Sequence, residues 1–166
     1  LDMQGRLLLQ RCKYWDKVAL KDEWKACQKQ ALDSIQQALS INTRSPHLWA
    51  NLLLVKSNLE QFDADFNKAL INARHLGPND FDVNRAVAHI GLLHWLRWQP
   101  EQKNLFRSAL FTIQEISPKE AMKIADASGK SALYCFWTRN DPRQFYNCKK
   151  KPVRRKASSA SGNVIP

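Results

Sequence analysis

The sequence predicts an all-α protein of about seven or eight helices, paired as antiparallel hairpins. Apolar residues recur every three or four positions along most of the chain, which is the spacing of one helix face. The alternation of apolar and polar residues that is typical of strands is scarce, and the 166 residues include only five glycines. Serine, glycine and proline separate the periodic segments, where they begin or end helices. Hydrophobic residues make up 44% of the chain, so one domain with a real core is expected.

The first predicted hairpin joins a helix over residues 3–15 to a second helix over residues 21–39. Leu8, Cys12 and Trp15 lie on one face of the first helix. The second helix has apolar residues at spacings of three or four, at Trp24, Cys27, Ala31, Ile35 and Ala38. Each of these helices therefore has an apolar face to bury.

The next two helices are predicted over residues 46–59 and 63–76. Ser45 can cap the first of them, and Pro46 suits its first turn because the missing N–H of proline has no partner there. Gly77, which a proline follows, stands where the end of a helix favours a left-handed residue. These boundary signals define the clearest hairpin of the chain.

A fifth helix is predicted from a cap at Asp80 or Asp82 to about Trp98. Its apolar residues cover more than one face, so it should be packed on two sides. These residues are Val83, Val87, Ala88, Ile90, Leu92, Leu93 and Trp95. Three further helices are predicted over residues 100–116, 119–127 and 131–137.

Residues 45–80 carry a recognisable pattern of large and small side chains. Large residues stand early in the first helix and near the turn, small ones in the second helix, and a proline at the end; they are Trp49, Leu52, Phe62, Ala69, Ala73 and Pro78. Ala88 and Gly91 fall where a following unit would place small residues. These hairpins resemble tetratricopeptide (TPR) repeats. The resemblance implies a right-handed stack over residues 1–137, and the alternative is an irregular helical bundle.

The resemblance also implies a binding groove. Stacked hairpins curve, and their inner helices line the concave side. The groove residues that the pattern indicates are His47, Asn58, Arg85 and His89. Arg85 and His89 are one helical turn apart, and together with His47 they could hold a carboxylate or a peptide segment.

The four cysteines form two local pairs, Cys12 with Cys27 and Cys135 with Cys148. A disulfide that closes either loop would stabilise the fold by roughly 3 kcal/mol, through the reduced entropy of the unfolded chain. Such pairing indicates an oxidising compartment. The alternative is four buried or idle thiols in a cytosolic protein. No C-x-x-C motif or close Cys/His cluster is present, so no metal site is expected.

The end of the chain is strongly basic. Six of the charges that make up the net charge of +11 fall in one short stretch, at Lys149, Lys150, Lys151, Arg154, Arg155 and Lys156. We expect a loop bracketed by cysteines over residues 138–148 and a disordered basic tail over residues 149–166. Such a tail can bind nucleic acid, anionic lipid or an acidic polymer, or it can remain solvated.

No recognisable catalytic motif is present, whether a nucleophile elbow, a phosphate loop, a dinucleotide fingerprint or a zinc-protease helix. We therefore expect no catalytic residue and no cofactor, and interpret the chain as a non-enzymatic protein-interaction scaffold. The alternative is a cytoplasmic nucleic-acid-binding helical-repeat protein that uses its basic tail.

The compact TPR-like domain, the cysteines and a chain that begins at Leu1 rather than at methionine are similar to VpsP-type polysaccharide-biosynthesis proteins. That resemblance implies a bacterial-envelope accessory protein, periplasmic or anchored in the membrane through a missing N-terminal segment. Its partner would be the machinery of polysaccharide assembly or export.

Overall fold

The computed structural model describes residues 21–140 and residue 148. Within these residues the chain is all-α, as predicted, with seven α-helices and one 3-10 helix. In chain order they are α2 (Lys21–Ile41), α3 (Pro46–Asn58), α4 (Ala64–Leu76), α5 (Phe81–Leu93), η1 (Trp95–Arg97), α6 (Pro100–Ile116), α7 (Pro118–Ala127) and α8 (Ser131–Trp137). The helix predicted over residues 3–15, most of the loop over 138–148 and the basic tail lie outside the described residues.

Short polar side chains fix where the helices begin. Ser45 Oγ accepts a hydrogen bond from the backbone N–H of Leu48 at 3.3 Å, as the sequence predicted. The carboxylates of Asp63 and Asp80 cap α4 and α5 in the same way, each at 2.9 Å from a backbone nitrogen. Because these groups satisfy N–H donors that have no partner within the helix, each helix begins at a defined residue.

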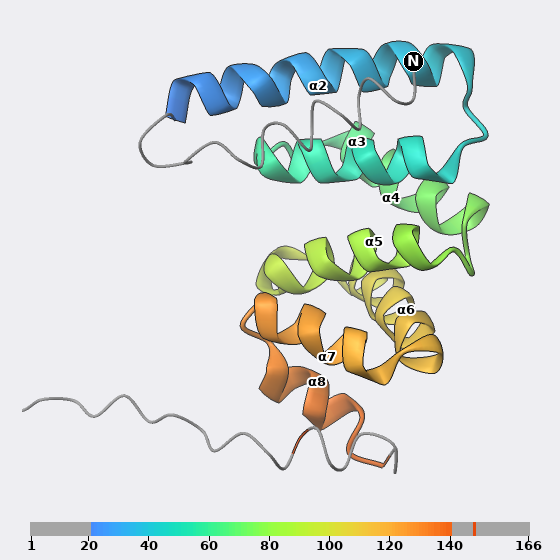
Figure 1. Ribbon diagram of the computed structural model, residues 1–166, viewed down its shortest axis with the longest axis vertical. Helices are drawn as coiled ribbons and strands as arrows, with labels where there is room; N and C mark the ends of the chain where they lie inside the picture. The colour runs from blue at the N-terminus through green and yellow to red at the C-terminus, as the bar shows by residue number, and fades with distance from the viewer. Residues whose placement is uncertain (1–20, 141–147, 149–166) are drawn as a thin grey trace, which may run out of the picture.

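The helices follow one another along the long axis of the molecule, from α2 at one end to α8 at the other (Figure 1). Each helix packs on the next in sequence, and in addition α3 contacts α5 and α5 contacts α7. The prediction that α5 is packed on several sides is confirmed, because it touches α3, α4, α6 and α7. One continuous apolar core runs through this stack from α2 to α8.

Two glycines allow close packing between helices. A side chain at Gly91 of α5 would overlap the ring of Phe106 in α6, so only glycine lets these two helices approach so closely. Gly77 was predicted to be left-handed, and this is wrong: its φ is −126°. Its Cα instead lies against Pro46, since a Cβ there would be 2.9 Å from the Cβ of that proline.

The fifth helix is shorter than predicted. It ends at Leu93 instead of continuing to Trp98, and a 3-10 turn over residues 95–97 follows. The indole of Trp98 is buried, stacks on Phe66 with ring centres 5.4 Å apart, and donates a hydrogen bond to the carbonyl of Gly91 at 3.0 Å. Burying this ring requires the chain to leave the helix, and Pro100 then begins α6.

The predicted disulfide between Cys135 and Cys148 is present, with Cα atoms 5.7 Å apart. Cys27 is also disulfide-bonded, whereas its predicted partner, Cys12, lies outside the described residues. None of the helices that the structure describes combines the length and the apolar character needed to span a bilayer.

Candidate functional site

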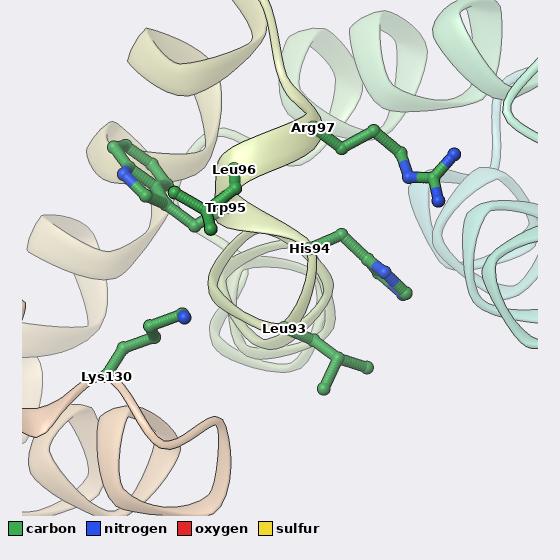
Figure 2. Close-up of a pocket in the computed structure, with 6 residues that line it drawn as sticks. All are labelled: Leu93, His94, Trp95, Leu96, Arg97 and Lys130. Carbon is green, nitrogen blue, oxygen red and sulfur yellow. The ribbon is translucent and has the colours of Figure 1, made fainter.

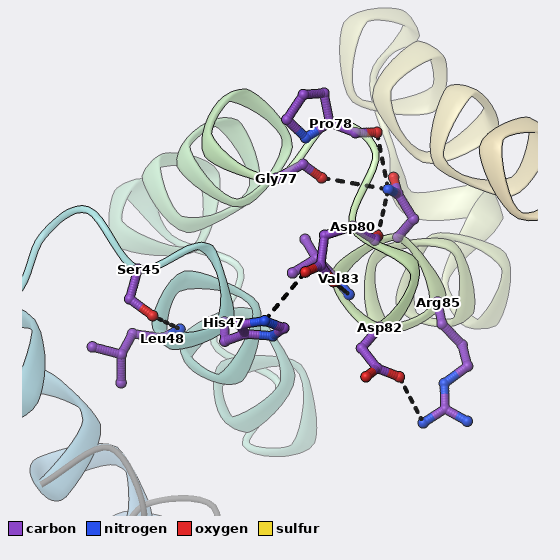
Figure 3. A network of polar contacts seen from close by, with 10 residues as sticks. Ser45, His47, Leu48, Gly77, Pro78, Asp80, Asp82, Val83 and Arg85 are labelled. Atoms are coloured by element: carbon purple, nitrogen blue, oxygen red, sulfur yellow. Dashed lines mark hydrogen bonds and ion pairs between the residues drawn. The ribbon is translucent and has the colours of Figure 1, made fainter.

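Two of the four predicted groove residues, His47 and Arg85, make polar contacts with carboxylates near the beginnings of helices (Figure 3). His47 Nε2 lies 3.2 Å from Asp80 Oδ2, and the other oxygen of this carboxylate caps α5. The guanidinium of Arg85 lies 3.7 Å from Asp82 and 3.9 Å from Glu120 of α7. These contacts join α3 to α5 and α5 to α7, so they hold neighbouring helices together.

The other two predicted residues lie further along the same helices. His89 Nδ1 is 3.4 Å from Ser128 Oγ, and Asn58 donates a hydrogen bond to Gln28 Oε1 of α2 at 3.1 Å. Asn58 is at the opposite end of α3 from His47, about 16 Å away at the rise of an α-helix. The structure therefore does not gather the four residues at one point.

Two adjoining hollows lie near the ends of α3 and α5. The first has a volume of about 480 Å³. The side chains that line it come from α2, the end of α3 and the end of α5; they are Trp24, Lys25, Ser57, Asn58, Leu59, Glu60, Leu93 and His94. Asn58 is thus the one predicted groove residue that lines this hollow.

The second hollow surrounds the turn after α5 and has a volume of about 430 Å³. Its lining is the continuous segment 93–97 together with Lys130, which precedes α8 (Figure 2). Leu93 and His94 belong to both hollows, so they form a shared wall between them. We call the two hollows and this wall the α5-turn surface.

Two leucines on this surface are exposed. Leu96 is 88% exposed and Leu93 is 48% exposed. Leu93 was predicted to be among the packed residues of the fifth helix, and this is wrong because the helix ends there. Leu96 is the most exposed large apolar side chain among the described residues, and Leu93 lies three positions before it, so the two form an apolar feature beside the hollows.

The charged residues that line the second hollow, around Leu96, are cationic. In Figure 2, Arg97 and Lys130 reach to opposite sides of Leu96. The guanidinium of Arg97 lies 4.6 Å from the centre of the Phe62 ring, and the ammonium of Lys103 lies 5.7 Å from the Trp95 ring. In the part of the chain that the structure describes, none of these three cations forms an ion pair.

His94, in the shared wall, is the titratable group most altered by this environment. Its ring packs edge-on against Phe62 at 5.0 Å, and its Nε2 lies 3.2 Å from Ser57 Oγ. Burial lowers the pKa of this imidazole, and the nearby charge of Arg97 lowers it further, while Glu60 acts in the opposite direction. The fold therefore favours the neutral form of this side chain.

Sequence reasoning missed the α5-turn surface because periodicity alone extends the helix through it. The available signal was Pro100, which disfavours helical geometry in the residue before it. What could not be read from the sequence is that Trp98 is buried while Leu96 is exposed, since this depends on Phe66 and Phe106 of other helices.

Comparisons of this chain with protein-family models, with curated proteins and with solved structures found no match. Both resemblances drawn from the sequence therefore remain predictions. Among the described residues, no three His, Cys, Asp or Glu side chains are grouped as they would be to hold a metal ion.

Proposed function

We propose that this protein is a non-enzymatic interaction scaffold and that the α5-turn surface binds its protein partner. The observation that carries the proposal is the pair of exposed leucines, Leu93 and Leu96, at hollows lined from several helices. Exposed apolar groups beside a concave, polar-rimmed surface are typical of protein-binding sites.

The packing of the helices supports a scaffold role. Because α3 contacts α5 and α5 contacts α7, side chains from elements far apart in the sequence contribute to one surface. A surface built on packed helices is held rigidly, which lowers the entropy lost when a partner binds. A TPR-like arrangement of the hairpins would explain how distant elements come to share one surface, and we include this arrangement in the proposal.

We further propose that the scaffold works in an oxidising compartment such as the bacterial envelope. The Cys135–Cys148 disulfide and the bonded state of Cys27 support this, because disulfides persist where thiols are not kept reduced. As the VpsP-type resemblance implies, we propose that the partner belongs to the machinery of polysaccharide assembly or export.

A photo-crosslinking amino acid at position 96 tests the proposed function in the cells that make the protein. We expect irradiation to join position 96 to one discrete protein. The matched control carries the same amino acid at position 41, where Ile41 is 70% exposed at the end of α2. That position should give no such adduct, because it lies outside the α5-turn surface.

Two results would contradict the proposal. Identical adducts at positions 96 and 41 would mean that the surface is not selective. An adduct that nuclease treatment removes would favour the nucleic-acid alternative. Trp24, Trp49 and Trp98 are buried, and the half-buried rings of Trp95 and Trp137 pack against each other, which leaves little aromatic surface for bases to stack on. We therefore expect a nuclease-resistant adduct.

A further inference from the structure

We infer that the α5-turn surface recognises an acidic protein segment that carries a leucine-like aliphatic side chain. This inference rests on the proposed function and names the chemistry of the partner. It follows from the apolar character of the second hollow, from the charges beside it and from the polar groups of the first hollow.

The second hollow is lined mainly by apolar side chains. Leu96 exposes most of its side chain, and Leu93 exposes about half. The half-buried ring of Trp95 completes the apolar lining and is itself held by Trp137, with ring centres 4.8 Å apart. A partner gains free energy by covering these side chains, and an aliphatic group fits a hollow that is lined by leucine and an indole.

The cations beside the second hollow determine the sign of the charge that a partner should carry. Arg97 and Lys130 are its charged lining residues, and Lys103 lies over the neighbouring Trp95 ring. Contacts with aromatic rings hold Arg97 and Lys103 in place. Cations that are positioned in advance and free of ion pairs among the described residues complement carboxylates on a partner.

The first hollow favours a peptide over a phosphate polymer or a lipid. Its lining contains one cation, Lys25, and one anion, Glu60, so it offers no net positive charge to a phosphate polymer or a lipid headgroup, and the amide of Asn58 lies beside them. Asn58 presents a hydrogen-bonding group of the kind that a peptide backbone can meet. An acidic segment anchored at Leu96 can therefore continue past Leu93 with its backbone, rather than its carboxylates, facing Glu60.

The basic tail must be separated from this surface in any test, because it attracts acidic peptides by charge alone. The full-length, disulfide-bonded protein is therefore prepared with the six basic residues between 149 and 156 replaced by glutamine. A phage library of random twelve-residue peptides is selected on this protein and depleted on the same protein with the uncharged substitution Leu96→Ser. We expect the enriched peptides to combine glutamate or aspartate with leucine or isoleucine.

The most enriched peptide is then synthesised with a fluorescent label, and its Kd is measured by anisotropy. The double variant Arg97→Gln/Lys130→Gln should weaken binding by roughly tenfold and flatten its dependence on salt. The matched control Lys29→Gln/Arg107→Gln removes two exposed charges elsewhere, on α2 and α6, and should leave the Kd unchanged. Equal thermal melting of all variants shows that the fold is retained.

Several outcomes would overturn the inference. Enriched peptides that are basic or uncharged but still need Leu96 would refute the acidic partner and leave the proposed function standing. Leu96-dependent binding to phosphatidylglycerol vesicles in place of peptides would assign the surface to a membrane. A dimer in solution that Leu96→Asp dissociates would assign it to a second copy of the chain. A crosslink from position 96 to residues 1–20 would assign it to the chain's own N-terminal segment. No enriched peptide, together with no adduct at position 96, would overturn both proposals.

Discussion

The turn after α3 and the turn after α5 make an instructive pair, because each follows a helix of 13 residues that a side chain caps. The turn after α3 is closed, in the sense that its buried cation is paired and its aromatic ring is packed. Lys56 is buried, and its ammonium lies 2.8 and 3.0 Å from the two carboxylate oxygens of Asp63. Phe62 then packs edge-on against Phe66 with ring centres 5.2 Å apart.

After α5 the corresponding groups remain open to solvent. Leu96 is 88% exposed, and Arg97 has an aromatic ring rather than a carboxylate as its neighbour among the described residues. The difference teaches that the closed turn pairs its buried cation and packs its aromatic ring, whereas the open turn leaves a leucine exposed and a cation without an ion pair among the described residues. The open turn is therefore the better candidate for binding, and four predictions probe this contrast.

The largest effect should come from the contact that supports the open turn. Phe106→Ala should destabilise the fold by about 3–5 kcal/mol, because it empties a buried site shared with Gly91 and Trp98. Gly91→Ala alone should cost about 1–3 kcal/mol through overlap with Phe106, and in the Phe106→Ala background it should cost much less. Urea denaturation of the four proteins measures this coupling, and strictly additive effects would contradict the proposed contact.

The closed turn should depend on a single carboxylate. Asp63→Ala should destabilise the fold by about 2 kcal/mol, since it removes the cap of α4 and leaves the buried ammonium of Lys56 without its main partner. Asp63→Asn keeps an oxygen for the cap and should be milder. The hydrogen bond from Lys56, together with its charge, lowers the pKa of Asp63, so this stabilisation is present above the ordinary pKa of 3.8 and is lost as the pH falls from there through the lowered value. Equal losses for the two variants would show that the charge contributes little.

His94, beside the open turn, should make the stability of the fold depend on pH in a higher range than Asp63 does. Its pKa in the folded state lies below its ordinary value of 6.5, so the unfolded chain binds the proton first as the pH falls. Its contribution to stability is complete above pH 6.5 and is lost as the pH falls through the lowered value. Urea midpoints between pH 7.5 and 5 should thus decline less for His94→Gln than for the wild type. If the urea midpoints of the two proteins declined in parallel with pH, His94 would not be the source of the pH dependence.

The smallest effect on stability should come from the exposed leucine. Leu96→Ser should change the free energy of unfolding by less than about 0.5 kcal/mol, because this side chain is almost fully in solvent. Thermal and urea unfolding measure this directly. A loss of more than 1 kcal/mol would mean that Leu96 contributes to the fold, and the contrast between the two turns would then be lost.

The sequence by itself determined the helical class and most helix boundaries. Ser45, Asp80 and Pro100 act within one turn of their own position, so their effect can be read without knowing the rest of the fold. The pairing of Cys135 with Cys148 was also readable, because a short loop separates the two residues.

Only the tertiary structure decided which residues of the α5 turn face the solvent. Trp98 is buried because rings from α4 and α6 meet it, and this burial ends α5 at Leu93 and exposes Leu96. Likewise, Gly77 is needed for its closeness to Pro46 rather than for a left-handed backbone. Such contacts join residues far apart in the chain, and a local pattern of spacings does not encode them.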